Sequence, residues 1–442
     1  MGVRRALAGG VLSLSLLGAL SAQIQSLTAY LSHAQAAPVF AALNEPAPRA
    51  QDWDRWIAAA DAATRARVAH GDETSIVNLL LFGTSFTTQP PITSQQLEAT
   101  HIGATVEQRI RDFERALELP GSNERLQFAR RILQGGPPLK ARLLSMIDRS
   151  MKEERTHAGL ITQAHALGDP SLEFAERSRM YRDRGLASDT SVRINFAIDE
   201  ALQRIKSAGV SAVVRRVAII GPGLDVVDKQ EGHDFYPPQT IQPLALIESL
   251  IRAGLADADT IRVTTLDVSA RVNEHIDEMT RRARAGASYV MHLPLDGTVA
   301  WSPELLHYFG RFGDAIGSAV PATLPPAIGP LRLRAVAVRP AVVERVSARD
   351  VNVTAQVLTL SDAERFDLII GTNVFIYYDR LQQGLAMASA AGMLQPGGLL
   401  LSNNALVEVP SSGMRSIGYS KTLYSNREED GDLIIWYQKT AR

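Results

Sequence analysis

Two patterns of hydrophobic and polar positions divide the chain. From about Asp52 to Gly209, apolar residues recur at helical spacing among charged ones, and turns rich in glycine and proline separate the repeats. The clearest amphipathic segments are 54–65, Glu107–Leu119, Glu124–Leu133 and Ile194–Ile205. This pattern predicts a helical N-terminal domain over residues 40–210.

After residue 210 the pattern changes to short segments rich in apolar and β-branched residues, which are typical of strands buried in a parallel sheet. These segments are Val217–Gly221, Thr260–Asp267, Arg365–Gly371 and Leu399–Ser402. Helical patterns lie between them, so the order predicts an α/β fold with a Rossmann-like sheet over residues 211–442. Two further strand signals, Ser416–Ser425 and Asp432–Gln438, flank a polar loop and predict a C-terminal antiparallel hairpin.

Residues 289–349 are interpreted as an insertion into this domain. A strand at Tyr289–Asp296 precedes an aromatic helix at 301–314, and a second strand follows at Arg332–Pro340. His292, Asp296 and His307 lie beside the aromatic residues, where they would either line a substrate pocket or belong to the core of the inserted subdomain.

Composition limits the chemistry that the chain can perform. The 442 residues are 45% hydrophobic and carry a net charge of −1, so nothing in the charge balance points to a nucleic acid as partner. The chain has no cysteine, which excludes disulfides, thiolate catalysis and cysteine-bound metals. Its nine histidines show no metal-ligand spacing, and no metal site is expected.

The first residues have the pattern of a targeting segment. Arg4 and Arg5 precede an uncharged run from Ala6 to Ala22, which predicts a signal peptide or membrane anchor within residues 1–36, ending at Ala22 or Ala36 if it is cleaved. The protein is therefore expected to be exported or attached to a membrane by its N-terminus. The alternative is an Ala-rich N-terminal helix on a cytoplasmic protein.

Candidate binding residues follow the predicted strands. Gly221-Pro-Gly223-Leu-Asp225 would form a tight turn in which missing side chains let backbone N–H groups approach a ligand. A long polar loop, 226–238, would then cover that ligand. Asp267 ends the next strand, where a carboxylate would accept both hydroxyls of a ribose or else cap the following helix, with Ser269 as a second cap.

These motifs carry a family resemblance. Gly221-Pro-Gly223, Asp267, Phe366-Asp-Leu-Ile-Ile-Gly-Thr-Asn373 and Leu394-Gln-Pro-Gly-Gly-Leu-Leu400 together resemble a class I S-adenosylmethionine-dependent methyltransferase. The block from Phe366 to Asp379 is similar to the chemotaxis-receptor glutamate methyltransferases, which also have a helical N-terminal domain.

The resemblance implies a fold, a cofactor and site residues. The sheet would have seven strands, one of them antiparallel, and S-adenosylmethionine would lie over the carboxyl ends of the first two. Gly221 and Gly223 would approach its amino-acid part, Asp267 its ribose, and Thr372 with Asn373 would lie near the methyl donor. Asp225, which stands where the family has a third glycine, is also counted among the cofactor-binding residues.

Methyl transfer needs little from the protein beyond positioning, because the sulfonium carbon is already activated. Asn373 and Tyr377 are the candidate catalytic residues, as groups that position an unknown acceptor. Asp379 is a weaker candidate, because it would serve equally as a helix cap. His233 or His292 would act as general base for a hydroxyl or amine acceptor, whereas a carboxylate would need no base.

Two other functions stay open on the sequence alone. The expanded loop and the signal-like start would suit an exported, non-catalytic binding or scaffold protein that retains a methyltransferase-like fold. The Gly-x-Gly turn would also suit a nicotinamide-dependent oxidoreductase, although the missing third glycine and the terminal hairpin argue against it.

Overall fold

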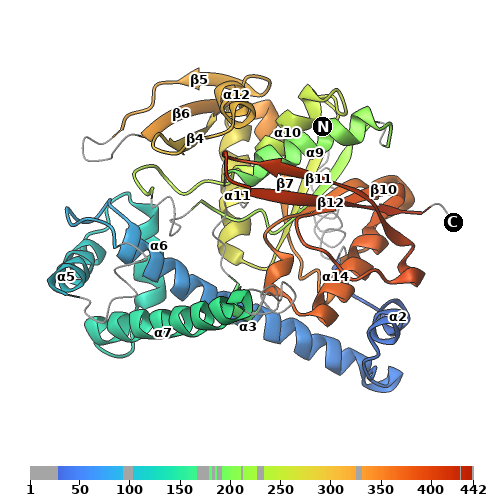
Figure 1. Ribbon diagram of the computed structural model, residues 1–442, viewed down its shortest axis with the longest axis horizontal. Helices are drawn as coiled ribbons and strands as arrows, with labels where there is room; N and C mark the ends of the chain where they lie inside the picture. Colours follow the sequence, from blue (N-terminus) through green and yellow to red (C-terminus); the bar gives the residue numbers. More distant parts are fainter. Residues whose placement is uncertain are drawn as a thin grey trace, which may run out of the picture.

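The computed structural model describes residues 28–92, 103–166, 179–181, 185–186, 192–210, 213–225, 233–324, 331–428 and 430–440. In Figure 1 a group of helices lies beside a sheet that other helices cover, and a smaller sheet lies above them. The uncharged run at 6–22 and most of the polar loop 226–238 fall outside the described residues.

A seven-stranded sheet is the centre of the molecule. Its strand order is β11-β12-β10-β9-β2-β3-β7, and of these seven strands only β12 runs antiparallel to the rest. The strands are β2 (Arg216–Ile220), β3 (Arg262–Asp267), β7 (Val346–Asp350), β9 (Phe366–Gly371), β10 (Leu394–Ser402), β11 (Met414–Leu423) and β12 (Gly431–Lys439). The predicted mixed α/β fold is confirmed, and the last two strands form the expected hairpin.

Both faces of this sheet are buried, because successive side chains of its strands enter two different cores. Ile219 and Ile370 pack with helices α9 (Ile194–Ser207), α10 (Gln242–Arg252) and α11 (Ala270–Arg284). Ala218 and Ile369 pack on the opposite face with α14 (Arg380–Met393) and α2 (His33–Leu43). The continuous apolar runs in the sequence follow from this burial on two sides.

The remaining long helices form a body with its own core. They are α5 (Ala104–Glu118), α6 (Glu124–Leu133), α7 (Leu139–Ala166) and the second half of α3 (Trp53–Phe82). Phe113 and Ile110 are fully buried at its centre. Helix α9, which the sequence pattern groups with these helices, packs instead on the sheet, because its apolar face meets α10, β11 and β12.

The insertion between α11 and β7 is a small antiparallel sheet with a helix. Its strands are β4 (Tyr289–Asp296), β6 (Leu331–Val338) and β5 (Gly317–Val320), with α12 (Pro303–Arg311) and the short α13 (Pro340–Val343). The insertion was expected to reach residue 349, but Val346–Asp350 is strand β7, which pairs in parallel with β3. This strand is short and polar at alternate positions, so it lacks the unbroken apolar run of the other strands.

The segment before α3 is packed into the fold. Strand β1 (Thr28–Tyr30) pairs with β8 (Gln356–Leu358), and Leu31 and Ala36 are fully buried. Of the two cleavage points considered, the one after Ala36 would cut α2 and remove β1, whereas the one after Ala22 leaves both intact. No helix among the described residues has the length and hydrophobicity to span a membrane. Single helical turns complete the fold at η1 (Ala50–Asp52), η2 (Asp362–Glu364), η3 (Phe375–Tyr377) and η4 (Pro410–Ser412).

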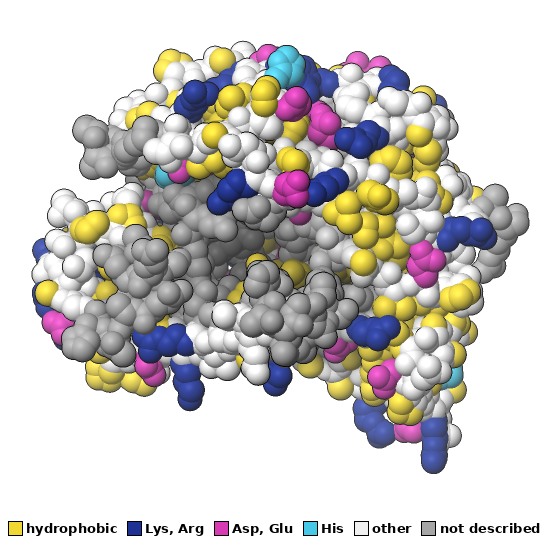
Figure 2. All heavy atoms as spheres, viewed as in Figure 1, with side chains coloured by type: hydrophobic (Ala, Val, Ile, Leu, Met, Phe, Trp, Pro, Cys, Tyr) yellow, Lys and Arg dark blue, Asp and Glu magenta, His cyan; other side chains and the backbone are white. Residues whose placement is uncertain are grey.

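The surface carries both signs of charge. On the face shown in Figure 2, basic and acidic side chains are intermingled, and neither sign forms a continuous field. This distribution agrees with the net charge of −1.

Candidate functional site

A pocket lies where β2, β3 and β9 end, at the carboxyl edge of the sheet. Of the seven residues expected to bind the cofactor or to position the acceptor, six line it: Gly221, Gly223, Asp267, Thr372, Asn373 and Tyr377. Apolar side chains complete the wall, including Val351 and Val353 after β7 and Val68 from helix α3. Segments that are more than 100 residues apart in sequence therefore meet in one pocket.

The turn after β2 depends on glycine. Gly221 and Gly223 have φ angles of 62° and 66°, in the left-handed region where a side chain is strained. The Gly221 N–H donates to the carbonyl of Leu266 at 2.9 Å, which ties the turn to the end of β3. A Cβ on Gly221 would lie 3.0 Å from Val374, so this turn has no room for a side chain.

Asp267 ends β3 and makes a local turn. Its Oδ1 accepts from the Ser269 N–H at 2.8 Å, while its carbonyl accepts from Asn273 at 3.0 Å. Ser269 is the N-cap residue of α11, but its side chain makes no capping hydrogen bond. Burial raises the pKa of the Asp267 carboxyl to about 7, and nearby Asp350 adds to the rise. The Asp267 carboxylate therefore bonds to backbone at the start of α11, and the residue also lines the pocket in which ribose binding was expected.

The end of β9 is held in an unusual backbone conformation. Asn373 has a φ of 59°, and its N–H donates to Oδ1 of Asn403 at 2.9 Å, while Asn403 Nδ2 donates back to Asn373 Oδ1 at 2.7 Å. Thr372 Oγ1 accepts from Gln242 at 2.8 Å. These bonds fix the two residues that were expected near the methyl donor.

Two residues near the pocket were missed in the sequence. Arg67 of α3 donates to the carbonyl of Tyr377 at 2.7 Å and so joins the helix to the pocket wall. Asn403 follows β10 as Asn373 follows β9, and this position after a buried strand was a signal that could have identified it. Nothing in the helical pattern around Arg67 distinguished it from other surface arginines.

Asp225 does not line the pocket. Its carboxylate is buried and accepts from the Tyr236 hydroxyl at 2.8 Å and from Gln239 at 2.9 Å. Arg125 of α6 donates to the carbonyls of Asp225, at 3.2 Å, and of Tyr236. The structure thus places Asp225 where it holds the two ends of the expanded loop together, away from Gly221 and Gly223.

The other polar candidates also lie elsewhere. Asp379 is the N-cap of α14, where its Oδ1 accepts from the Gln382 N–H at 2.8 Å. Asp296 and His307 are exposed on the insertion, and His233 contacts Phe235 rather than the pocket. His292 stacks on Tyr236 with ring centroids 5.2 Å apart and lines a different cavity.

The pocket is narrow. Its volume is about 60 Å³, far below the roughly 300–1,000 Å³ of pockets that bind small molecules. Val374 lies against the glycine turn, and Tyr377 and Tyr378 line the same pocket. A nucleoside-sized ligand would therefore require this segment to shift.

No protein-family model matches the chain, and no curated protein matches it. Solved structures that it is similar to include the glycopeptide N-methyltransferase MtfA complexed with S-adenosyl-L-methionine, at 12% identity over 55% of this chain and 94% of that one, with a TM-score of 0.28. Magnesium protoporphyrin IX methyltransferase ChlM from Synechocystis PCC 6803 shares 11% identity over 59% of this chain and 83% of its own, with a TM-score of 0.27. MtNAS in complex with MTA and tNA shares 10% identity over 78% of this chain and 100% of its own, with a TM-score of 0.28. At these values the fold assignment rests on the strand order described above.

Proposed function

We propose that this protein transfers a methyl group from S-adenosylmethionine, which would occupy the pocket at the carboxyl edge of the sheet. The main support is the convergence in one pocket of six residues chosen from the sequence, five of them for this cofactor and Tyr377 for the acceptor, in a seven-stranded sheet with one antiparallel strand. Two of the solved structures named above, those of MtfA and ChlM, were determined with S-adenosylmethionine.

The residues present suit such a ligand in their chemistry. The glycine turn brings backbone without side chains into the pocket wall, where it would approach the amino-acid part, and Asp267 offers a carboxylate to ribose hydroxyls. The cofactor, when bound, supplies an electrophilic methyl group. Asn373 and Tyr377 would then orient the acceptor, and the apolar wall would exclude water from the reacting atoms.

The acceptor that suits this pocket is a carboxylate. Among the described lining residues, Asp267 and two tyrosines are the titratable groups, and burial raises the pKa of Tyr378 above its ordinary value. No histidine lines this pocket within the part of the chain that the structure describes. A carboxylate is already deprotonated near neutral pH and needs no base, as in the glutamate methyltransferases that the block 366–379 resembles.

Calorimetry with S-adenosylmethionine and with S-adenosylhomocysteine tests the cofactor directly. Saturable binding of both, with loss of binding in a pocket variant, would support the enzyme. A folded protein that binds neither would instead favour the non-catalytic alternative. For the acceptor, transfer of radiolabel from the cofactor into a base-labile ester would support a carboxylate, and a base-stable product would exclude it.

A further inference from the structure

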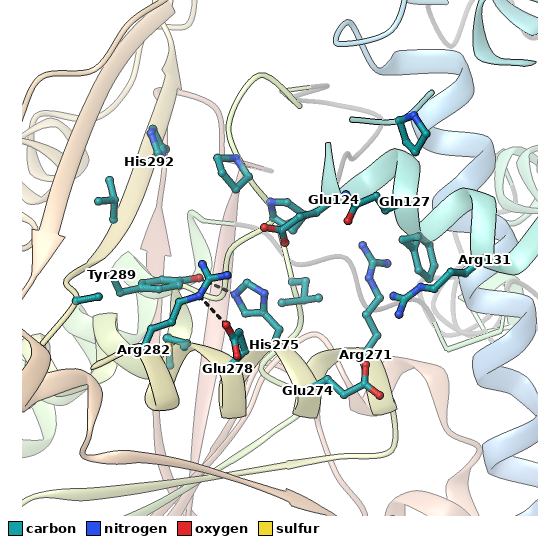
Figure 3. A pocket seen from close by; sticks show the side chains of 18 of the residues that line it. Glu124, Gln127, Arg131, Arg271, Glu274, His275, Glu278, Arg282, Tyr289 and His292 are labelled. Carbon is teal, nitrogen blue, oxygen red and sulfur yellow. Dashed lines mark hydrogen bonds and ion pairs between the residues drawn. The ribbon is translucent and has the colours of Figure 1, made fainter. Parts of the chain in front are cut away.

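A second and much larger cavity lies between α6, α11 and β4 (Figure 3). We call it the cleft; its volume is about 920 Å³. Leu224 lies in its wall, whereas the neighbouring Gly223 lies in the wall of the pocket, so the turn after β2 separates the two spaces. Thr372 and Asn373, the residues expected near the methyl donor, line the pocket and not the cleft. An acceptor would therefore meet its binding groups at the pocket, around Asn373.

A chain of hydrogen bonds runs from Asn373 into the core of the main sheet. Its further members are Asn403 after β10, Asp432 near the start of β12 and Tyr424 after β11. Asn403 Nδ2 donates to Asp432 Oδ1 at 3.0 Å, and the Tyr424 hydroxyl donates to Asp432 Oδ2. Burial raises the pKa of the Tyr424 phenol, with the Asp432 charge adding to the rise, so the phenol keeps its hydrogen. Tyr424 is buried beside Phe196, and it anchors the chain in the core.

Two neighbours determine the orientation of the Asn403 side chain. The backbone N–H of Asn373 can only donate, so the Asn403 atom that lies 2.9 Å from it is the oxygen Oδ1. The Asp432 carboxylate can only accept, so the Asn403 atom that faces it is the nitrogen Nδ2. Both neighbours therefore require the same orientation of this amide.

The orientation of Asn403 in turn determines that of the Asn373 side chain. Asn403 Nδ2 also lies 2.7 Å from the Asn373 side chain, and because Nδ2 is a donor, the atom that it meets is the acceptor Oδ1. The Asn373 Nδ2 lies on the other side of its amide and has no hydrogen bond to the residues that the structure describes. Asn373 is exposed and lines the pocket, so this N–H2 group is available to a ligand.

We propose that Asn403 and Asp432 are positioning residues, which hold the Asn373 amide with its N–H2 group toward the methyl acceptor. This role rests on the function proposed above. An N–H2 group donates to an oxygen of a carboxylate, whereas it cannot bind an ammonium group, which also only donates. The second carboxylate oxygen would then give a lone pair to the methyl carbon as the carbon–sulfur bond breaks and its electrons stay on sulfur. The products are a methyl ester and a neutral thioether, and no proton has to be removed.

Acetate and acetamidinium test this role, because the two ions have the same planar shape but acetate only accepts hydrogen bonds and acetamidinium only donates them. Each is titrated into the full chain saturated with S-adenosylhomocysteine. Binding is followed by NMR through the side-chain amide signal of Asn373, which is assigned by its absence in Asn373→Asp. In wild type, acetate should shift this signal and should bind at least about tenfold more tightly than acetamidinium.

The double variant Asn403→Asp with Asp432→Asn should reverse the chain while keeping its net charge. The new asparagine at 432 can donate to the new aspartate at 403 and still accept from Tyr424, and the aspartate can still accept from the Asn373 N–H. Because the aspartate only accepts, Asn373 must turn its N–H2 toward it and its oxygen toward the ligand. The ratio of acetate to acetamidinium affinity should fall at least about tenfold, a change that a purely structural role would not produce.

Asn373→Asp tests the N–H2 group itself. Aspartate tolerates the φ of 59° and still accepts from Asn403, but it presents an oxygen where the N–H2 was, so acetate binding, measured here by calorimetry, should be lost. Asn44→Asp is the matched control. Asn44 has a φ of 55°, is exposed at the end of α2 and does not line the pocket, so acetate should bind this variant as it binds wild type.

The results distinguish this role from the function on which it rests. When S-adenosylhomocysteine binds, an unchanged ratio in the double variant, retained acetate binding in Asn373→Asp, or an Asn373 signal that acetate does not shift would each overturn the positioning role alone. If wild type does not bind S-adenosylhomocysteine, the proposed methyl transfer is wrong and the positioning role falls with it.

Discussion

The pocket and the cleft lie on two sides of the same turn, yet they are built differently. The pocket is about 60 Å³ and is walled by backbone, apolar side chains and a single carboxylate, Asp267. The cleft is about 920 Å³ and is walled by long charged side chains from α6 and α11, with Tyr289 and His292 of β4. The fold of the sheet creates the first, whereas the packing of the helical body and the insertion against α11 creates the second. Substitutions should therefore affect the two spaces independently.

Gly221→Val should have the largest effect on the pocket. A side chain there combines a positive φ with a 3.0 Å approach to Val374, so binding of S-adenosylmethionine should be abolished. Gly286→Val is the matched control, because Gly286 also has a positive φ but has no atom within 4 Å of the added Cβ. It should cost about 1–2 kcal/mol of stability and leave binding intact. Calorimetry and thermal melting of both variants measure the difference.

Arg125→Met should damage the cleft and spare the pocket. Arg125 is buried and donates to the carbonyls of Asp225 and Tyr236, in the loop that carries the cleft-lining Pro237 and Pro238. Leaving these carbonyls unpaired should cost about 2–4 kcal/mol in urea unfolding, with faster amide hydrogen exchange in that loop. Arg109→Met should cost a similar amount, because Arg109 is as buried, but its bonds stay within the helical body. Faster exchange in the cleft-lining loop of the Arg109 variant would contradict this separation.

Asp267→Ala should weaken binding of S-adenosylmethionine more than about tenfold, since a charge-assisted hydrogen bond contributes about 1.5–3 kcal/mol. The control is Asp257→Ala, an exposed aspartate in the loop before β3. Affinity that stays the same in a folded Asp267 variant would remove the ribose assignment.

The affinity should also depend on pH through Asp267. Its pKa is raised from 3.8 to about 7, and the ionised carboxylate is the form that accepts ribose hydroxyls, so affinity should rise with pH up to about 7 and then level. The same shift acts on stability in the opposite direction: folding disfavours the charged form, and stability is lost as pH rises from about 4 to 7. Melting of wild type and Asp267→Asn across this range should show a smaller loss in the variant, which keeps only the contribution of other buried acids such as Asp72.

The smallest effect is expected at Asp379, which the structure makes a helix cap. Asp379→Ala should cost about 1 kcal/mol of stability and leave cofactor affinity unchanged. If affinity or transfer rate fell further than in an equally destabilised variant, Asp379 would have a role in binding or methyl transfer.

The sequence predicted the pocket far better than the cleft, for a physical reason. Parallel strands bring their carboxyl ends to one edge, so Gly221, Asp267 and Asn373 could be placed together from strand order alone. Asp225 was misplaced because a residue two positions after a glycine turn can face either way, and here Tyr236 and Gln239 attract its carboxylate. The cleft depends on how α6 meets α11, and no pattern in either helix encodes that packing. The edge strand β7 was missed because five partly polar residues give too weak a signal.

Helix α3 is a member of two cores at once. Trp53 and Ile57 pack with the sheet, while Ile76–Phe82 lie at the centre of the helical body, about 30 Å farther along the same helix. A continuous helix shared in this way joins the helical body rigidly to the main sheet, so the two cannot separate unless the helix breaks. Entry of a ligand into the pocket then depends on the short segment Val374–Tyr378 rather than on domain opening. Because each core is incomplete without the shared helix, unfolding by urea should follow one cooperative transition.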